Sequence, residues 1–150
     1  MNELDFSGVL TWWNELKEDT GGRAELRRAH NPAEVVFVPA YHRVYGRSDA
    51  SKIDKEALAC VAGLCAHVKE DDRKGKFAEQ MAAKNISGLR FRRLLAIKDR
   101  EYLYHAMIRI IRQLGGAVNV VDLAKTVYWW NEKTKKDLAY AYYTNASTEK

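Results

Sequence analysis

The residues that most often carry catalysis form no recognisable active-site motif in this sequence of 150 residues. Cys60 and Cys65 are five positions apart, which fits neither a CxxC redox pair nor a zinc site, and we expect two buried thiols. Asp71 and Asp72 stand in the mixed-charge run KEDDRKGK, which is typical of a solvated loop rather than a metal-binding carboxylate pair. The histidines show no HExxH or other ligand spacing; they are His30, His42, His67 and His105. Because a glycine-rich phosphate loop and a GxSxG motif are also missing, the sequence predicts no enzyme, no catalytic residue, no cofactor and no metal.

The basic residues are more informative, because they recur at helical spacing opposite apolar stripes. In the segment that begins at Arg100, His105, Arg109 and Arg112 fall at i, i+4 and i+7, away from the apolar side. The preceding segment crowds four cations onto a single helix: Arg90, Arg92, Arg93 and Lys98. Arginine forks bind phosphate oxygens bidentately, so such helix faces could follow a nucleic-acid backbone.

A third basic segment, RAELRR, places Arg23 and Arg27 at i and i+4, with Arg28 alongside. The alternative for all three segments is an ordinary solvated face or a set of internal ion pairs. Glu25 and Glu101 are close enough in sequence to occupy some of the arginines. Arg23 has a further alternative, which is to brace its short helix against the bundle.

The aromatic residues recur beside Leu and Val at helical spacing. Exposed rings could stack on unpaired bases, but this spacing favours packing in the core or against another subunit. We therefore leave them out of the expected binding site; they are Trp12, Trp13, Trp129, Trp130, Tyr140, Tyr142 and Tyr143.

The composition permits a nucleic-acid partner without selecting one. Lys and Arg number 25 against 20 Asp and Glu, which gives a net charge of +5. The first residues, with Glu3 and Asp5, contain no apolar run and do not resemble a secretory signal. No stretch approaches the roughly 18 apolar residues that a membrane span needs. We expect a cytoplasmic protein with no membrane partner.

The pattern of apolar residues predicts an all-α fold, since only two prolines and nine glycines interrupt it. A first helix, Ser7–Lys17, should end at Gly21-Gly22. Asn31 reads as the N-cap of a short helix, with Glu34 closing a capping box. Val35–Val38 is the only β-like run. Further helices are expected over Arg23–Ala29, Ser51–Val68, Phe77–Ala83, the stripe that ends at Gly115-Gly116, Asn119–Trp130 and the region of Leu138.

The charged run KEDDRKGK is the best candidate for a boundary inside the chain. We expect an N-terminal helical bundle over residues 1–68, a connecting loop over 69–76 and a C-terminal bundle over 77–150.

Four blocks of the sequence, in order and spread over nearly the whole chain, resemble one known family. They are Trp12-Trp13 with GRAELRRA (22–29), Pro32 with PAYHR (39–43), LRFRRLLA (89–96), and Val118-Asn119 with Asp122-Leu123-Ala124, YWWN (128–131) and Tyr142-Tyr143. Together they are similar to the CasB family, the small subunit of the type I-E CRISPR Cascade complex. Residues 46–83 resemble the family least.

The resemblance implies two small helical bundles, with about seven to nine helices in all, packed together with a basic face. It also implies a non-catalytic antiviral-defence subunit that stabilises the R-loop formed by guide RNA and target DNA, together with the displaced strand, without reading sequence. The implied partners are the guide RNA, the target and non-target DNA strands, the large and backbone subunits, and a second copy of the chain.

Ten side chains are expected to contact nucleic acid: Arg27, Arg28, Lys52, Arg90, Arg92, Arg93, Lys98, Arg100, Arg109 and Arg112. The alternative function is a helical DNA-binding transcription regulator, which needs a recognition helix and a symmetric dimer on a palindrome. A small nuclease that uses Asp71 or Asp72 is a third and weaker hypothesis.

Overall fold

Ten helices and one pair of two-residue strands make up residues 6–146, which are the residues that the computed structural model describes. The helices are α1 (Phe6–Glu18), α2 (Thr20–Arg28), α3 (Pro32–Val35), α4 (Pro39–Tyr45), α5 (Lys55–Cys65), α6 (Phe77–Ala83), α7 (Gly88–Leu95), α8 (Arg100–Gln113), α9 (Val120–Tyr128) and α10 (Glu132–Asn145). The strands β1 (Glu70–Asp71) and β2 (Ala117–Val118) pair in parallel. The all-α prediction is confirmed, with one helix more than the upper end of the expected range. Glu3 and Asp5 lie outside the described residues.

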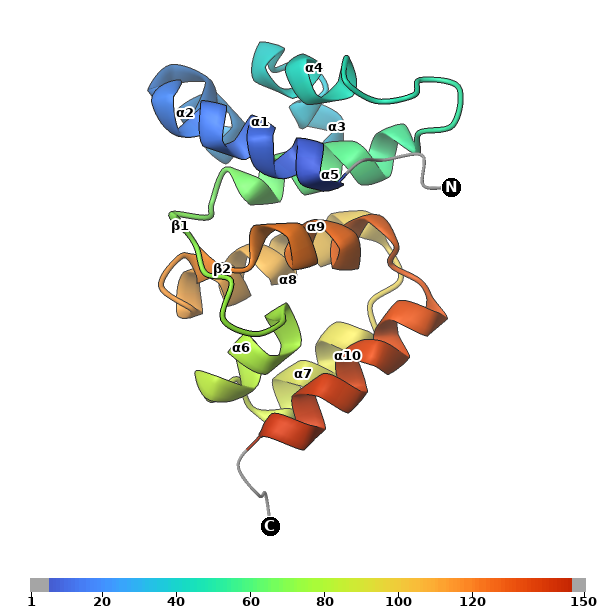
Figure 1. Ribbon diagram of the computed structural model, residues 1–150. Coiled ribbons are helices and arrows are strands. Elements are labelled where there is room, and N and C mark those ends of the chain that lie inside the picture. The colour runs from blue at the N-terminus through green and yellow to red at the C-terminus, as the bar shows by residue number, and fades with distance from the viewer. Residues whose placement is uncertain (1–5, 147–150) are drawn as a thin grey trace.

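The helices form three tiers, in which α8 and α9 occupy the middle (Figure 1). Helices α1 to α5 lie at one end of the molecule, and α6, α7 and α10 lie at the other. Helix α5 is the centre of the core, because Ala57–Cys65 are all buried and the helix packs against α3, α8 and α9. Helix α1 also packs on α9, and α6 packs on α10.

The expected boundary over residues 69–76 carries the strand β1, which bonds to the chain after α8. Glu70 pairs with Ala117 and Asp71 with Val118, and the Asp71 carboxylate accepts from the Val120 N–H at 3.1 Å. Helices α8 and α9 of the second half pack against α5 of the first, so buried side chains form one continuous cluster. The division into two bundles therefore stays a prediction.

Two local expectations, the end of the first helix and the capping box, are wrong. In each case a carboxylate accepts a hydrogen bond from a backbone N–H group other than the expected one. Gly21 and Gly22 do not end the first helix but lie in the first turn of α2, where the Asp19 carboxylate accepts from the Gly22 N–H at 3.0 Å. A Cβ at Gly22 would crowd that carboxylate and lie 3.1 Å from the Ala40 Cβ, so a larger residue there would displace the cap. Asn31 does cap α3, but Glu34 accepts from the backbone of His30 and does not close a box with Asn31.

Other boundaries shift in the same way. The helix expected from Ser51 begins at Lys55, because Asp54 caps it by accepting from the Ala57 N–H. The β-like run Val35–Val38 ends one short helix and precedes the next. Gly115 and Gly116 terminate α8 as predicted, with φ angles of 74° and 80° that favour glycine.

Most of the aromatic residues pack inside the molecule, as the spacing predicts. Trp12 and Trp13 are buried and donate from their indole N–H groups to the carbonyls of Ala40 and Val68. Tyr142 is buried against Phe91. Tyr140 and Tyr143 are 78% and 50% exposed, so they do not pack in the core, and their packing against another subunit stays a prediction.

The two cysteines are buried free thiols, as predicted. Burial raises the pKa of each to about 12, so neither is a nucleophile at neutral pH. Within residues 6–146, no helix is long and apolar enough to cross a membrane.

Candidate nucleic-acid interface

Helix α2 presents Arg27 and Arg28 in its last turn, where cations also favour the negative end of the helix dipole. Both side chains are exposed, because Gly22 and Leu26 form the buried side of the helix. Arg23 instead turns inward, and its guanidinium donates to the carbonyls of Ala66 at 3.1 Å and Val68 at 2.9 Å. Burial and the neighbouring Arg27 both lower the pKa of Arg23. The bracing alternative for Arg23 is therefore confirmed.

Helix α8 presents Arg109 and Arg112 on its outer side. Its opposite side is buried and consists of Leu103, Tyr104, Ala106, Met107, Ile110 and Ile111. The Tyr104 hydroxyl donates to the Ala29 carbonyl at 3.1 Å, which fixes the end of α2 beside the first half of α8. The other end of α8 is held near the chain that Arg23 contacts, because Lys69 N–H donates to the Gly116 carbonyl at 2.8 Å. The end of α2 therefore lies toward the first half of α8, and the start of α2 lies toward the end of α8.

The arginines of α2 and α8 meet around His67. The pKa of His67 is lowered to about 4, chiefly by burial and in addition by the charges of Arg112, Arg27 and Arg23. The Nε2 atom of His67 is buried and has no hydrogen-bond partner. The imidazole is therefore neutral at physiological pH. The positive potential around it comes from the neighbouring guanidinium groups. Nothing in the sequence indicates this convergence, since the three arginines lie 40 or more residues away from His67 along the chain.

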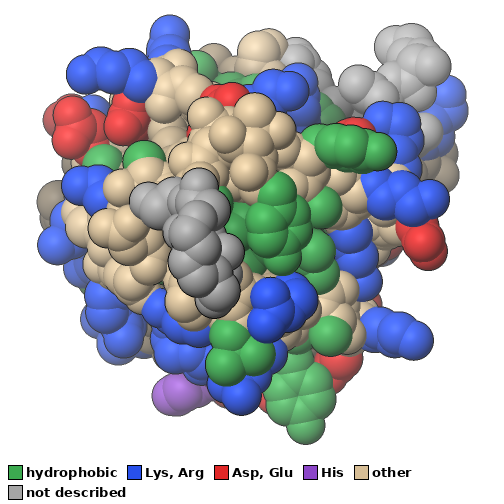
Figure 2. Space-filling view, turned by 90° about the horizontal axis from the view of Figure 1, so that it is seen from below, with side chains coloured by type: hydrophobic (Ala, Val, Ile, Leu, Met, Phe, Trp, Pro, Cys, Tyr) green, Lys and Arg blue, Asp and Glu red, His purple; other side chains and the backbone are tan. Residues whose placement is uncertain are grey.

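Helix α7 adds further arginines next to the C-terminal end of α8. Its buried residues are Gly88, Phe91 and Leu94, which leaves Arg92 and Arg93 exposed. Arg90 donates to the side-chain oxygen of Gln113 at the end of α8, which joins the two helices. Seen from the end that carries α6, α7 and α10, Lys and Arg side chains gather along the lower margin of the molecule (Figure 2). We call Arg27, Arg28, Arg90, Arg92, Arg93, Arg109 and Arg112 the basic surface.

The other three candidates lie elsewhere. The Arg100 guanidinium donates to the carbonyls of Val127 and Tyr128, at 2.6 and 3.1 Å, and so satisfies the C-terminal end of α9. Arg100 therefore donates to two backbone carbonyls of the fold, and its expected contact with nucleic acid stays a prediction. Lys52 is exposed just before Asp54, whose N–H donates to the Tyr128 hydroxyl. Because Tyr128 also contacts Arg100, Lys52 lies near the start of α8. Arg112 is near the other end of that helix, about 20 Å away.

Lys98 is exposed in the connection between α7 and α8. Its neighbour Ile97 is fixed by two donors to its carbonyl, the Trp130 indole at 2.8 Å and the Lys135 ammonium at 3.1 Å. Lys98 therefore lies near the start of α8, at the end of that helix opposite Arg112.

Within residues 6–146, no arginine of the basic surface forms an ion pair with a carboxylate. Glu25 and Glu101 are not paired with any of them, so the alternative of internal ion pairs does not hold there. Arg43 and Arg47, by contrast, bond to Asp19 and Glu15 at 3.0 and 2.7 Å. Apart from Arg90, the arginines of the basic surface also show no side-chain hydrogen bond to an acceptor within the described residues.

The part of the chain that the structure describes is thus an almost entirely helical protein that presents arginines without carboxylate partners on three helices. The family model of CRISPR-associated protein Cse2 matches residues 22–143. The chain belongs to this family, which confirms the resemblance to CasB. The match includes residues 46–83, where the resemblance is weakest.

A search of solved structures supports the fold. The chain is similar to a chain in the crystal structure of E. coli Cascade bound to a PAM-containing dsDNA target, with a TM-score of 0.79 and 19% sequence identity. The similarity covers 96% of this chain and 97% of the other. A search of curated protein sequences finds no significant match.

Proposed function

We propose that this chain is the non-catalytic small subunit of a type I-E Cascade complex in the cytoplasm. There it holds the R-loop and the displaced strand through sequence-independent contacts to phosphates. The proposal rests on membership of the Cse2 family and on the similar chain that is part of a DNA-bound Cascade. The proposed partners are the guide RNA, both DNA strands, the large and backbone subunits, and a second copy of the chain.

One observation carries the nucleic-acid role: the arginines of the basic surface come from three helices and have no carboxylate partner among residues 6–146. Unpaired guanidinium groups on rigid helices bind phosphate oxygens without paying to break an internal ion pair. Each phosphate contact releases counterions, so the affinity adds up over the surface and falls with salt. Exchange of a DNA duplex for an RNA–DNA hybrid is nearly balanced in free energy, so a few such contacts can decide its direction.

The test is charge reversal at one position on each contributing helix. We expect the triple variant Arg27→Glu, Arg92→Glu, Arg109→Glu to co-purify with the guide-RNA-containing complex but to lose R-loop stabilisation. The affinity of the isolated chain for DNA should fall about 100-fold or more, since three phosphate contacts become repulsive. Gel-shift titration and the rate of R-loop collapse measure these effects.

The matched control reverses three exposed lysines outside the basic surface: Lys74→Glu, Lys84→Glu and Lys125→Glu. It changes the net charge equally, so it separates the placement of charge from its amount. Normal R-loop stability in the arginine variant, or an equal loss in the lysine variant, would overturn the assigned surface. A footprint on a dyad-symmetric operator would instead favour a transcription regulator.

A further inference from the structure

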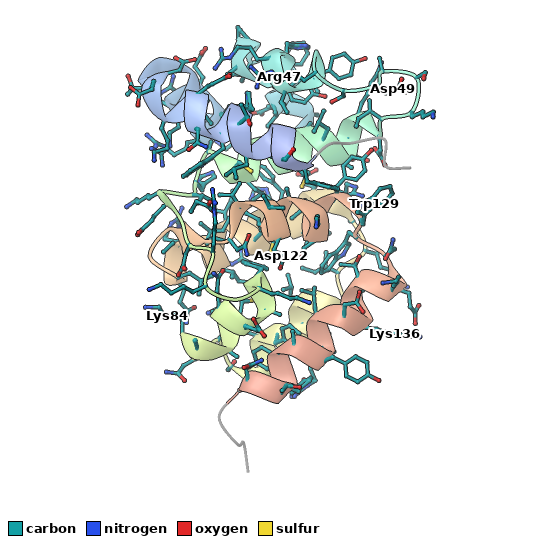
Figure 3. The ribbon with its side chains drawn as sticks, viewed as in Figure 1. Arg47, Asp49, Lys84, Asp122, Trp129 and Lys136 are labelled. Atoms are coloured by element: carbon teal, nitrogen blue, oxygen red, sulfur yellow. The ribbon has the colours of Figure 1, made fainter. Side chains whose placement is uncertain are left out.

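The outer face of α10 carries exposed tyrosines that the fold does not use. Lys136, Tyr140 and Tyr143 fall at i, i+4 and i+7 and share one side of the helix. The only buried residues of α10 are Leu138 and Tyr142, on the opposite side. Figure 3 shows Lys136 projecting from α10 away from the body of the molecule. A tyrosine that is 78% exposed adds nothing to the core, so its role lies outside the chain.

The Tyr143 ring is held in place even though half of it is exposed. Its edge meets Phe91 of α7, with ring centroids 5.6 Å apart, and Tyr142, with centroids 5.0 Å apart. Phe91 and Tyr142 stack at 4.0 Å, and the Tyr142 hydroxyl donates to the Ile86 carbonyl. Tyr143 therefore stands on a rigid aromatic base, and a flat ligand would meet it without first ordering a loose side chain.

A shallow depression of about 580 Å³ lies between the two exposed rings. Its lining is Lys136, Ala139, Tyr140, Tyr143 and Thr144. Apart from the rings, Ala139 is the only apolar side chain in it. A groove for an amphipathic helix is lined by aliphatic side chains, and this one is not.

The charge around the depression is positive. Lys133 is neutralised by Asp137 at 3.1 Å, whereas Lys136 has no ion pair within residues 6–146. Arg92 and Arg93 directly follow Phe91, the residue on which Tyr143 rests, and α7 contains no acidic residue. Hydrophobic side chains on this end of the molecule are bordered by Lys and Arg side chains (Figure 2). The Tyr143 ring thus lies against α7, the helix that carries Arg92 and Arg93 of the basic surface.

Flat rings beside unpaired cations match the chemistry of a single nucleic-acid strand. Every base has a π-face, so stacking on tyrosine does not select sequence, and a duplex offers no free faces. From this geometry we propose that Tyr140 and Tyr143 stack on unpaired bases of a single strand whose phosphates contact Lys136 and Arg92. This inference rests on the proposed function and adds a preference for unpaired over paired strands.

The experiment compares the binding of a fluorescein-labelled oligothymidine and of a matched duplex by the purified full chain, measured by fluorescence anisotropy. For Tyr140→Ala with Tyr143→Ala, we expect the single-strand Kd to rise about tenfold or more, from the stacking contribution of two bases. The duplex Kd should stay within about twofold, because no phosphate contact is lost. The salt dependence of single-strand binding should keep its slope for the same reason.

Two variants control for damage to the fold. Tyr140→Phe with Tyr143→Phe keeps both rings and should bind as wild type. Tyr102→Ala removes a tyrosine that is 69% exposed on α8, outside the depression, and should also bind as wild type. Thermal unfolding of each variant checks the fold.

Unchanged single-strand binding by the alanine double variant overturns the inference. Loss of co-purification with the partner subunits alone would assign the rings to a protein contact and also overturn it. Both results leave the proposed function standing, whereas wild-type protein that binds neither oligonucleotide would refute the proposed function itself.

Discussion

Arginines in two regions of this molecule differ in what their guanidinium groups contact. On the side of α1 and α4, Arg43 and Arg47 are paired with Asp19 and Glu15. Arg47 lies at the end of the molecule opposite α10 (Figure 3). On the side of α2, α7 and α8, arginines of similar exposure have no carboxylate partner within residues 6–146. A count of basic residues does not show this difference. In the second region, binding of a polyanion releases water and counterions and breaks no internal ion pair.

A third kind of arginine sharpens the comparison, because Arg23 and Arg100 each donate to two backbone carbonyls. They stand in basic segments of the sequence but contribute to stability. Position in a basic motif is therefore a poor guide to function unless the acceptor of each guanidinium is known.

The largest effect is expected for Arg100→Ala. It leaves the carbonyls of Val127 and Tyr128 without their donors, and the free energy of unfolding should fall by about 2 kcal/mol. The salt dependence of DNA binding should not change. Arg93→Ala, on the basic surface, is the matched control, and its unfolding free energy should change by less than about 0.5 kcal/mol. Urea unfolding measures both, and equal stability of the two variants would break the distinction.

A smaller effect separates Arg27 from Arg43. Arg27→Ala should weaken DNA binding about three- to fivefold and lower the slope of log K against log salt by about 1, the share of one phosphate contact. Arg43→Ala removes a paired arginine and should change neither quantity. Its stability should change by less than about 1 kcal/mol, as for other exposed ion pairs. Salt titrations of both proteins provide the measurement, and the same slope change in both would show that pairing is irrelevant.

The smallest effect concerns the pH dependence of stability through His67. The folded protein holds the His67 pKa at about 4, whereas the ordinary value is 6.5. Between pH 4 and pH 6.5 the unfolded chain therefore binds more protons than the folded protein. The free energy of unfolding should therefore fall as the pH is lowered from 6.5 to 4. We expect a contribution of about 1 kcal/mol, because solvent screens the partly exposed ring.

His67→Gln should remove this part of the pH dependence, and His30→Gln, which replaces a histidine exposed at the surface, should retain it. NMR titration of the imidazole offers a second check. Bound oligonucleotide should raise the His67 pKa, because phosphates offset Arg112, Arg27 and Arg23. A His67 pKa that does not respond to oligonucleotide would place the nucleic acid away from this cluster.

Much of the local structure follows from the sequence because it depends on short-range chemistry. Asn31, Asn119 and the Gly115-Gly116 pair act as helix caps where the sequence predicts them. The burial of Trp12 and Trp13 follows from apolar periodicity. The prediction that Gly21 and Gly22 end the first helix is wrong, because Asp19, a residue outside the expected helix, caps α2.

The sequence by itself determined the all-α fold, the family, and the fact that arginines cluster on helix faces, since helical periodicity and composition are properties of neighbouring residues. Only the tertiary structure decided which guanidinium groups are free. The acceptors of Arg23 and Arg100 lie 43 and 27 residues away or more along the chain, and the tyrosines of α10 meet α7 only after folding. Hydrogen bonds and ring contacts between distant segments produce no periodic pattern in the sequence. The charged residues can therefore be counted from the sequence, but which of them are free of internal partners cannot be predicted from it.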